Sequence, residues 1–192
     1  MQDLNKLAAE LHADAVERGF WDVDDALDKH FVKMHSELSE AMQEERCGRP
    51  MLYVDDIEIP SGRITDVNAF DGRKPEGIAA ELADFVMMAL DLWAQIELDL
   101  NGIFLEEREI LRSDSYAQFR NMEVYKLALI CHSMLMKIRK LEGNASTTLS
   151  AMAICTFGVE LWLEQRGVNL WDVIRLKADY NKSRPKLHGR KY

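Results

Sequence analysis

The chain has 192 residues, of which 47% are apolar, so it can bury a hydrophobic core, and we expect one domain spanning residues 1–192. Its formal charge of −9 argues against a protein that binds duplex nucleic acid, because phosphate contacts need clustered Lys and Arg. The longest apolar runs are too short to cross a bilayer, and the start of the chain lacks the apolar centre of a signal peptide. A cytoplasmic location without membrane contact is therefore expected.

Helical spacing of apolar residues recurs along most of the chain. It predicts helices at 2–19, 22–46, 76–100, 117–141, 147–166 and 169–183. Asp22 and Asn169 are residue types typical of N-caps, and Pro75 is typical of a first helical position. The pattern predicts an all-α protein, a multi-helix bundle.

Residues 49–75, between the second and third predicted helices, interrupt this pattern with Pro, Gly and Asp. They contain two alternating runs, "MLYV" at 51–54 and "GRITDV" at 62–67, which predict either a long loop or a short hairpin. The insertion is longer than a bundle connection requires. A lid, an oligomer contact and a passive insertion all remain open.

The predicted helix after the insertion carries acidic residues beside its apolar face. On a helical wheel Glu81 projects between Phe85 and Met88, Asp84 lies just outside the face, and Asp91 is nearly in line with Asp84. A carboxylate within an apolar stripe is removed from water. We therefore expect Glu81 to be at least partly buried.

The helix before the insertion repeats this arrangement, because Glu37, Glu40 and Glu44 follow the border of its core stripe. If the two helices pack through their apolar stripes, the two acid pairs converge in one cluster: Glu37, Glu40, Glu81 and Asp84. Converging carboxylates repel one another unless they take up protons or bind a cation. Oxygen ligands favour Mg²⁺ or Mn²⁺ over Zn²⁺, since no His or Cys lies at ligand spacing beside them. One Glu-x-x-Glu pair alone would indicate only the solvated border of an amphipathic helix, whereas two acid pairs on two core helices indicate a shared site.

These residues resemble a known family. "SELSEAMQEE" at 36–45 and "KPEGIAAELADFVMMALDL" at 74–92 are similar to the Glu-x-x-Glu and Glu-x-x-Asp signature of the MazG-like, all-α nucleoside triphosphate pyrophosphohydrolases, to which the dimeric dUTPases are related. The resemblance covers residues 31–93, and 169–192 is similar to the Lys, Asn and Arg pattern that closes such domains. Two departures are Ser36, where many members carry Glu, and the long gap between Glu40 and Glu81.

The resemblance implies hydrolysis of a nucleoside triphosphate to the monophosphate and pyrophosphate, as house-cleaning or control of the nucleotide pool. It implies Mg²⁺ bound by the four acids named above, and a homo-oligomer, either a dimer or a tetramer. Attack of water on phosphorus needs charge neutralisation and positioning more than a covalent nucleophile. We expect Glu37 or Glu40 to activate the water, with Glu44 as a further candidate.

Near the basic tail at 185–192, the helical spacing of Lys177, Asn181 and Arg184 places them on one face of the last predicted helix. Cations at a helix C-terminus are commonly only solvated. The resemblance instead implies that the three residues bind the substrate phosphates.

Two other functional classes fit an acidic helical bundle. A di-iron carboxylate bundle needs Glu-x-x-His pairs, and none of the chain's five His residues follows a Glu at that spacing. An acidic interaction module without activity would leave Glu81 exposed and bind no metal. The sequence does not indicate base or sugar preference, the number of metal ions or the choice between dimer and tetramer.

Overall fold

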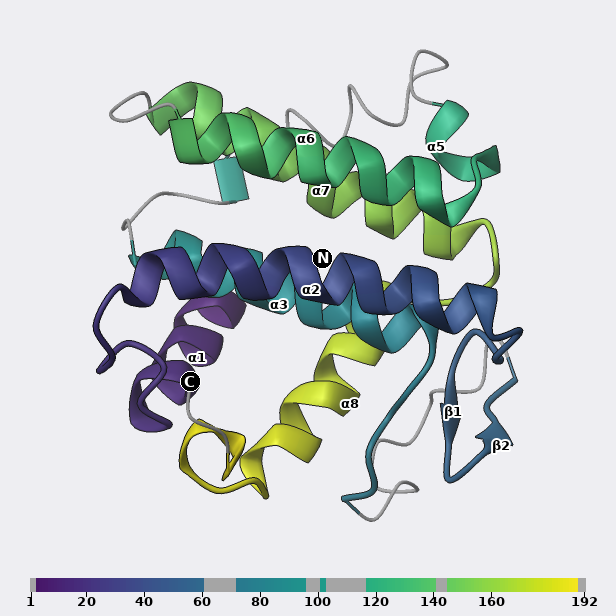
Figure 1. Ribbon diagram of the computed structural model, residues 1–192, viewed down its shortest axis with the longest axis horizontal. Helices are drawn as coiled ribbons and strands as arrows, with labels where there is room; N and C mark the ends of the chain where they lie inside the picture. The colour runs from purple at the N-terminus through teal and green to yellow at the C-terminus, as the bar shows by residue number, and fades with distance from the viewer. Residues whose placement is uncertain (1–2, 61–71, 96–100, 103–116, 141–144, 190–192) are drawn as a thin grey trace.

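The computed structural model describes residues 3–60, 72–95, 101–102, 117–140 and 145–189. It confirms the predicted all-α bundle, and the described residues include one two-stranded sheet (Figure 1). Within the described residues, none of the helices is long and apolar enough to cross a membrane. In chain order the helices are α1 (Leu4–Glu17), α2 (Ala26–Arg46), α3 (Ile78–Gln95), α5 (Gln118–Asn121), α6 (Val124–Lys140), α7 (Ala145–Glu164) and α8 (Leu170–Lys182), followed by a 3₁₀ turn (Lys186–Gly189).

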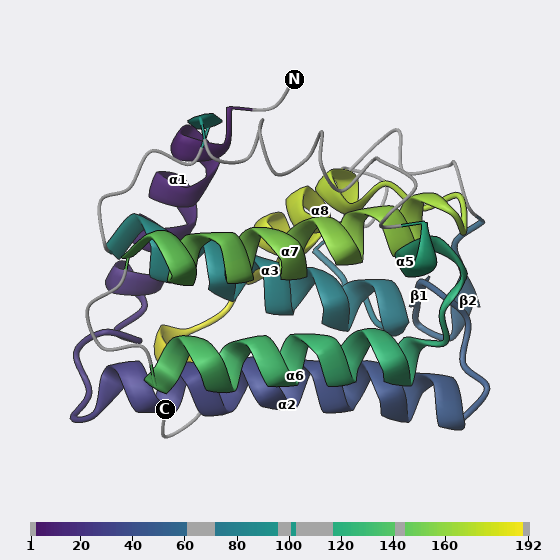
Figure 2. The same cartoon turned by 90° about the horizontal axis from the view of Figure 1, so that it is seen from above.

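Helix α3 lies at the centre of the bundle. It packs against α1, α2, α7 and α8, while α6 lies beside α2 and packs on α7 (Figures 1 and 2). Buried residues occur all around α3 from Ile78 to Trp93, and small side chains such as Ala79, Ala80 and Ala83 let neighbouring helices approach closely. A carboxylate on α3 is therefore enclosed by other helices even when it lies at the edge of the apolar face.

The structure confirms one of the two predicted N-caps and contradicts the other. Asn169 caps α8 as predicted, since its Oδ1 accepts hydrogen bonds from the backbone N–H groups of Trp171 at 2.9 Å and Asp172 at 3.2 Å. The assignment of Asp22 was wrong. Helix α2 begins at Ala26, after Asp25 in the left-handed conformation, and the carboxylate of Asp22 pairs with Lys186 instead.

The start of α3 also differs from the sequence prediction, because Pro75 does not occupy its first turn. Glu76 forms a two-way backbone bridge with Tyr53, with both N–O distances 2.9 Å, and this keeps the chain extended until Gly77. Gly77 has φ +104°, and a Cβ there would lie 2.7 Å from the carbonyl oxygen of Pro50. Only glycine fits this close approach, after which α3 begins at Ile78.

Two short strands follow α2. Strand β1 (Tyr53–Val54) pairs in antiparallel register with β2 (Ile57–Glu58). The run "MLYV" therefore pairs with the residues directly after it. Residues 61–71, which include the second predicted run, lie outside the described residues.

The single helix predicted at 117–141 is divided into α5 and α6. Met122 between them is extended, with φ −78° and ψ 158°. Its carbonyl oxygen accepts hydrogen bonds from Trp162 Nε1 at 2.9 Å and Arg166 Nη2 at 3.1 Å. These contacts with α7 and with the turn that follows it satisfy a carbonyl that helix continuation would otherwise use.

Candidate functional site

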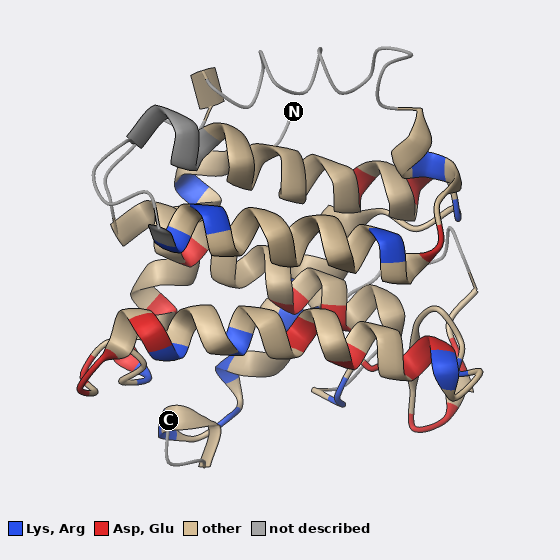
Figure 3. Ribbon diagram, turned by 45° about the horizontal axis from the view of Figure 1, so that its top comes forward, with Lys and Arg blue, Asp and Glu red and all other residues tan. Residues whose placement is uncertain are grey.

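Three of the four predicted metal ligands meet between α2 and α3. One carboxylate oxygen from each of Glu37, Glu40 and Glu81 lies within 4.8 Å of the other two. Glu37 is 6% exposed and Glu81 8% exposed, whereas Glu40 is open to solvent. Figure 3 shows red segments of α2 and α3 gathered near the middle of the bundle, close to blue ones. The burial of Glu81 agrees with its sequence prediction and disagrees with the exposed position that an interaction module would require.

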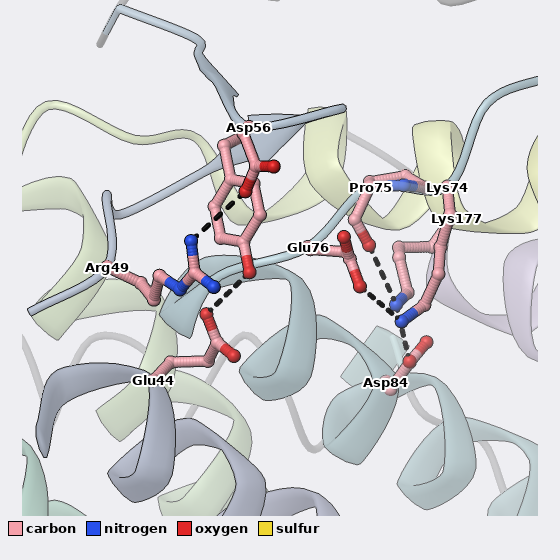
Figure 4. Close-up of polar contacts among 9 residues, drawn as sticks. Glu44, Arg49, Asp56, Lys74, Pro75, Glu76, Asp84 and Lys177 are labelled. Carbon is pink, nitrogen blue, oxygen red and sulfur yellow. Dashed lines mark hydrogen bonds and ion pairs between the residues drawn. The ribbon is translucent and has the colours of Figure 1, made fainter. Parts of the chain in front are cut away.

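The fourth predicted ligand, Asp84, is held by a lysine of α8. Its Oδ2 lies 2.6 Å from Lys177 Nζ, which also donates to the carbonyl oxygen of Pro75 at 3.4 Å (Figure 4). Burial acts to lower the pKa of Lys177, but the carboxylates of Asp84 and Glu81 outweigh burial and raise it. Lys177 is therefore a fixed positive charge, only 3% exposed, beside the three glutamates.

The two buried glutamates bind protons unusually tightly. Burial, followed by the charges of neighbouring carboxylates, raises the pKa of Glu37 to about 9. Burial also raises the pKa of Glu81 to about 7, although Lys177 acts in the opposite direction. Without a cation, the cluster must hold protons at neutral pH. Three oxygen donors with this excess of negative charge fit a hard divalent cation such as Mg²⁺ or Mn²⁺.

The acids line a cavity of about 340 Å³ that also contains all three predicted substrate-binding residues, Lys177, Asn181 and Arg184. Helix α8 ends at Lys182, so Arg184 lies beyond the helix and not on its face as the spacing predicted. A turn returns it to the cavity, with its backbone N–H bonded to the carbonyl oxygen of Asn181 at 3.0 Å. The cavity therefore combines an acidic wall with a cationic and amide wall from the end of the chain.

Several residues of this cavity were not predicted from the sequence, including Lys33, Lys74 and Tyr180. Lys33 lies one turn before Glu37 on α2, so helical spacing could have indicated it. Ser36, one of the departures from the family pattern, lines the cavity, and its Oγ donates to Glu40 Oε1 at 2.8 Å. It therefore orients one of the three clustered carboxylates.

Glu44, the further candidate for water activation, is engaged elsewhere. Its Oε2 accepts a hydrogen bond from Tyr53 Oη at 3.0 Å. Burial and this hydrogen bond raise the pKa of Tyr53 to about 12. Glu44 is not among the residues that line the cavity, and its position in Figure 4 is at a distance from Asp84 and Lys177. It fits a role in attaching β1 to α2.

The raised pKa values predict how the metal-free protein responds to pH. In the folded state Glu81 and Glu37 keep protons up to about pH 7 and about pH 9, whereas the ordinary value of both is 4.5. The folded state thus binds more protons than the unfolded state over this window, so stability falls as pH rises from about 5 to about 9. Urea unfolding in a chelator should show this fall, and added Mg²⁺ should reduce it. A stability that is constant or rises across the window would contradict the prediction.

Comparisons of the chain with protein-family models, with curated proteins and with solved structures found no match.

Proposed function

We propose that the protein is a Mg²⁺-dependent nucleoside triphosphate pyrophosphohydrolase that releases the monophosphate and pyrophosphate. The observation that carries this proposal is the meeting of Glu37, Glu40 and Glu81 within 4.8 Å, in a cavity that also contains cationic residues of α8 and its extension. The resemblance of the two acidic motifs to MazG-like enzymes supports the same activity.

In this proposal the three glutamates hold the cation, and Asp84 lies beside them, positioned by Lys177. A bound divalent cation would neutralise charge on the phosphate oxygens of the substrate. Either Glu37 or Glu40 accepts the proton of the attacking water. Phosphoryl transfer depends on positioning and charge more than on a covalent nucleophile, so water can attack directly. A carboxylate beside the water orients it and accepts its proton.

The cationic wall binds the phosphates. Asn181 supplies an amide and Arg184 a guanidinium to the same cavity, and a guanidinium can contact two phosphate oxygens at once. Lys177 acts differently, because its buried ammonium pairs with Asp84. It positions the carboxylate and reduces the net negative charge that an anionic substrate meets.

The test is product analysis. The protein is incubated with Mg²⁺ and a panel of canonical and altered nucleoside triphosphates, and the monophosphate, diphosphate, pyrophosphate and phosphate are separated. Equal amounts of monophosphate and pyrophosphate are expected. Release of single phosphates, or inactivity on the whole panel, would contradict the proposal. A Glu45→Gln variant provides a matched control, because Glu45 is an exposed acid of α2 that does not line the cavity.

A further inference from the structure

The cavity extends beyond the acidic cluster to a second polar group, formed by His30 of α2 and Asp91 of α3. His30 is 8% exposed and Asp91 6% exposed, so both are buried groups that face the cavity. The lining also includes apolar side chains such as Leu11, Val23 and Met87, together with Lys33, which follows His30 by three residues on α2. A cavity with phosphate-binding chemistry at one end, buried polar groups at the other and apolar side chains in its lining fits a nucleotide.

The spacing along the helices supports one ligand that reaches both ends. His30 precedes Glu37 by seven residues on α2, and Asp91 follows Asp84 by seven residues on α3. Seven residues are nearly two helical turns, so each pair shares a face and is separated by about 10 Å. His30 contacts Met88 and Glu37 lies beside Glu81, so α2 and α3 run in opposite directions. The step from Glu37 back to His30 and the step from Asp84 forward to Asp91 therefore lead to the same end of the cavity. The separation is comparable with that between the phosphates and the base of an extended nucleotide.

The hydrogen bonds of Asp91 leave one oxygen directed at His30. Its Oδ1 lies 2.7 Å from His12 Nδ1 and accepts from Trp21 Nε1 at 3.1 Å. Its Oδ2 lies 3.7 Å from His30 Nδ1, which is too long for a hydrogen bond. The carboxylate is therefore oriented through one oxygen, while the other is available to a ligand.

The state of His30 follows from its other nitrogen. Nε2 lies 2.8 Å from the carbonyl oxygen of Met88, which can only accept, so Nε2 carries a proton. Burial lowers the pKa of His30, although Asp91 acts against this, and a neutral ring leaves a lone pair on Nδ1. Two acceptors, Nδ1 and Asp91 Oδ2, then lie 3.7 Å apart in the lining of the cavity. An amino group, which has two N–H donors, satisfies both, whereas a carbonyl oxygen would be repelled by both.

We propose that His30 and Asp91 bind the base of the nucleotide and select bases with an exocyclic amino group, cytosine or adenine, over their oxo counterparts. This inference rests on the proposed function for the assignment of the phosphate end. Trp21, whose ring stacks on His30 with centroids 5.2 Å apart, keeps the imidazole in place. The site thus separates substrate choice at one end of the cavity from phosphate chemistry at the other.

Matched pairs of nucleotides test the selection in the wild-type protein. Equilibrium binding is measured by calorimetry for dCMP against dUMP and for dAMP against dIMP. The members of each pair differ in the exocyclic amino or oxo group and in the ring nitrogen beside it, which is an acceptor in the amino bases and an N–H donor in the oxo bases. At least one amino member should bind about 10-fold to 100-fold more tightly than its oxo partner, because the oxo group places a third acceptor beside two buried acceptors. Equal binding within both pairs, tighter binding of the oxo members or no binding of any of the four would overturn the inference.

This binding experiment and the product analysis together distinguish failure of the base site from failure of the proposed function. If the monophosphates show the amino preference but no triphosphate yields pyrophosphate, the base site stands and the hydrolytic activity fails. If pyrophosphate is released equally from dCTP and dUTP, and from dATP and dITP, the hydrolase stands and the base assignment fails.

An Asp91→Asn variant sharpens the test. The amide oxygen can keep the hydrogen bonds to His12 and Trp21, which places an N–H donor where Oδ2 faces His30. The preference for amino bases should fall to less than about 3-fold or reverse, through KM and with little change in kcat. Asp28→Asn is the matched control, because Asp28 pairs with Arg139 outside the cavity and its loss should leave the preference unchanged. An unchanged preference in a folded Asp91→Asn protein would overturn the role of Asp91.

Discussion

If the protein is the proposed pyrophosphohydrolase, replacing Glu81 by Gln is expected to lower pyrophosphate release by about 100-fold to 1,000-fold, because it removes a buried carboxylate from the three-carboxylate cluster. The same change should make the metal-free protein more stable at about pH 8. Wild-type Glu81 has a pKa of about 7, so at this pH it carries a charge that burial and its neighbours disfavour. Loss of activity together with a gain in stability is the signature of a group that serves ligand binding at the expense of the fold.

Two measurements check this expectation: steady-state release of pyrophosphate with saturating Mg²⁺, and urea unfolding in a chelator. Glu45→Gln, an exposed change on α2, should alter neither quantity appreciably. Wild-type activity in Glu81→Gln would remove this residue from the site. Reduced activity accompanied by a large loss of metal-free stability would indicate a role in the fold.

Replacing Lys177 by Met is expected to destabilise the protein by about 3–5 kcal/mol, since it leaves the Asp84 carboxylate without its ion-pair partner beside other acids. Met keeps most of the side-chain volume, so the loss reports the charge more than the packing. Removal of the lysine also leaves Asp84 able to bind a cation. Mg²⁺ should therefore restore more stability to the variant than it adds to the wild-type protein.

The matched control for this change lies on the same helix. Lys182 pairs with Asp179 at 2.5 Å, but both side chains are exposed, so Lys182→Met should cost less than about 1 kcal/mol. Urea unfolding of both variants, with chelator and with Mg²⁺, provides the comparison. Equal losses in the two variants would show that the buried pair has no special role in stability.

The acidic cluster could be predicted from the sequence because it depends on the spacing of residues along single helices. Glu81 stands among apolar residues at helical spacing, and Glu37 and Glu40 follow a core stripe on the preceding helix. Once two amphipathic helices pack through their apolar faces, acids at the borders of those faces are brought together. The convergence of Glu37, Glu40 and Glu81 followed from this rule without knowledge of any other helix.

Other features depend on contacts between distant segments and could not be predicted in this way. Lys177 was expected to bind phosphate, yet its ion pair with Asp84 depends on how α8 docks against α3. The break at Met122 reflects hydrogen bonds from Trp162 on α7 and from Arg166 in the turn after it. The late start of α3 reflects the bridge between Tyr53 and Glu76. In each case a tertiary contact overrides a sound local preference.

The bridge between Tyr53 and Glu76 also explains how the site tolerates the long separation of its acidic motifs. Tyr53 is tied to Glu44 through its hydroxyl group and to Glu76 through its backbone, so the chain leaving α2 and the chain entering α3 are fastened to each other. The cluster of acids depends on this junction and not on the number of residues beyond it. Doubling the length of a closed loop costs only about 0.6 kcal/mol. The segment between the two motifs is thus a position where evolution can add or remove residues while the distances among the clustered acids stay the same.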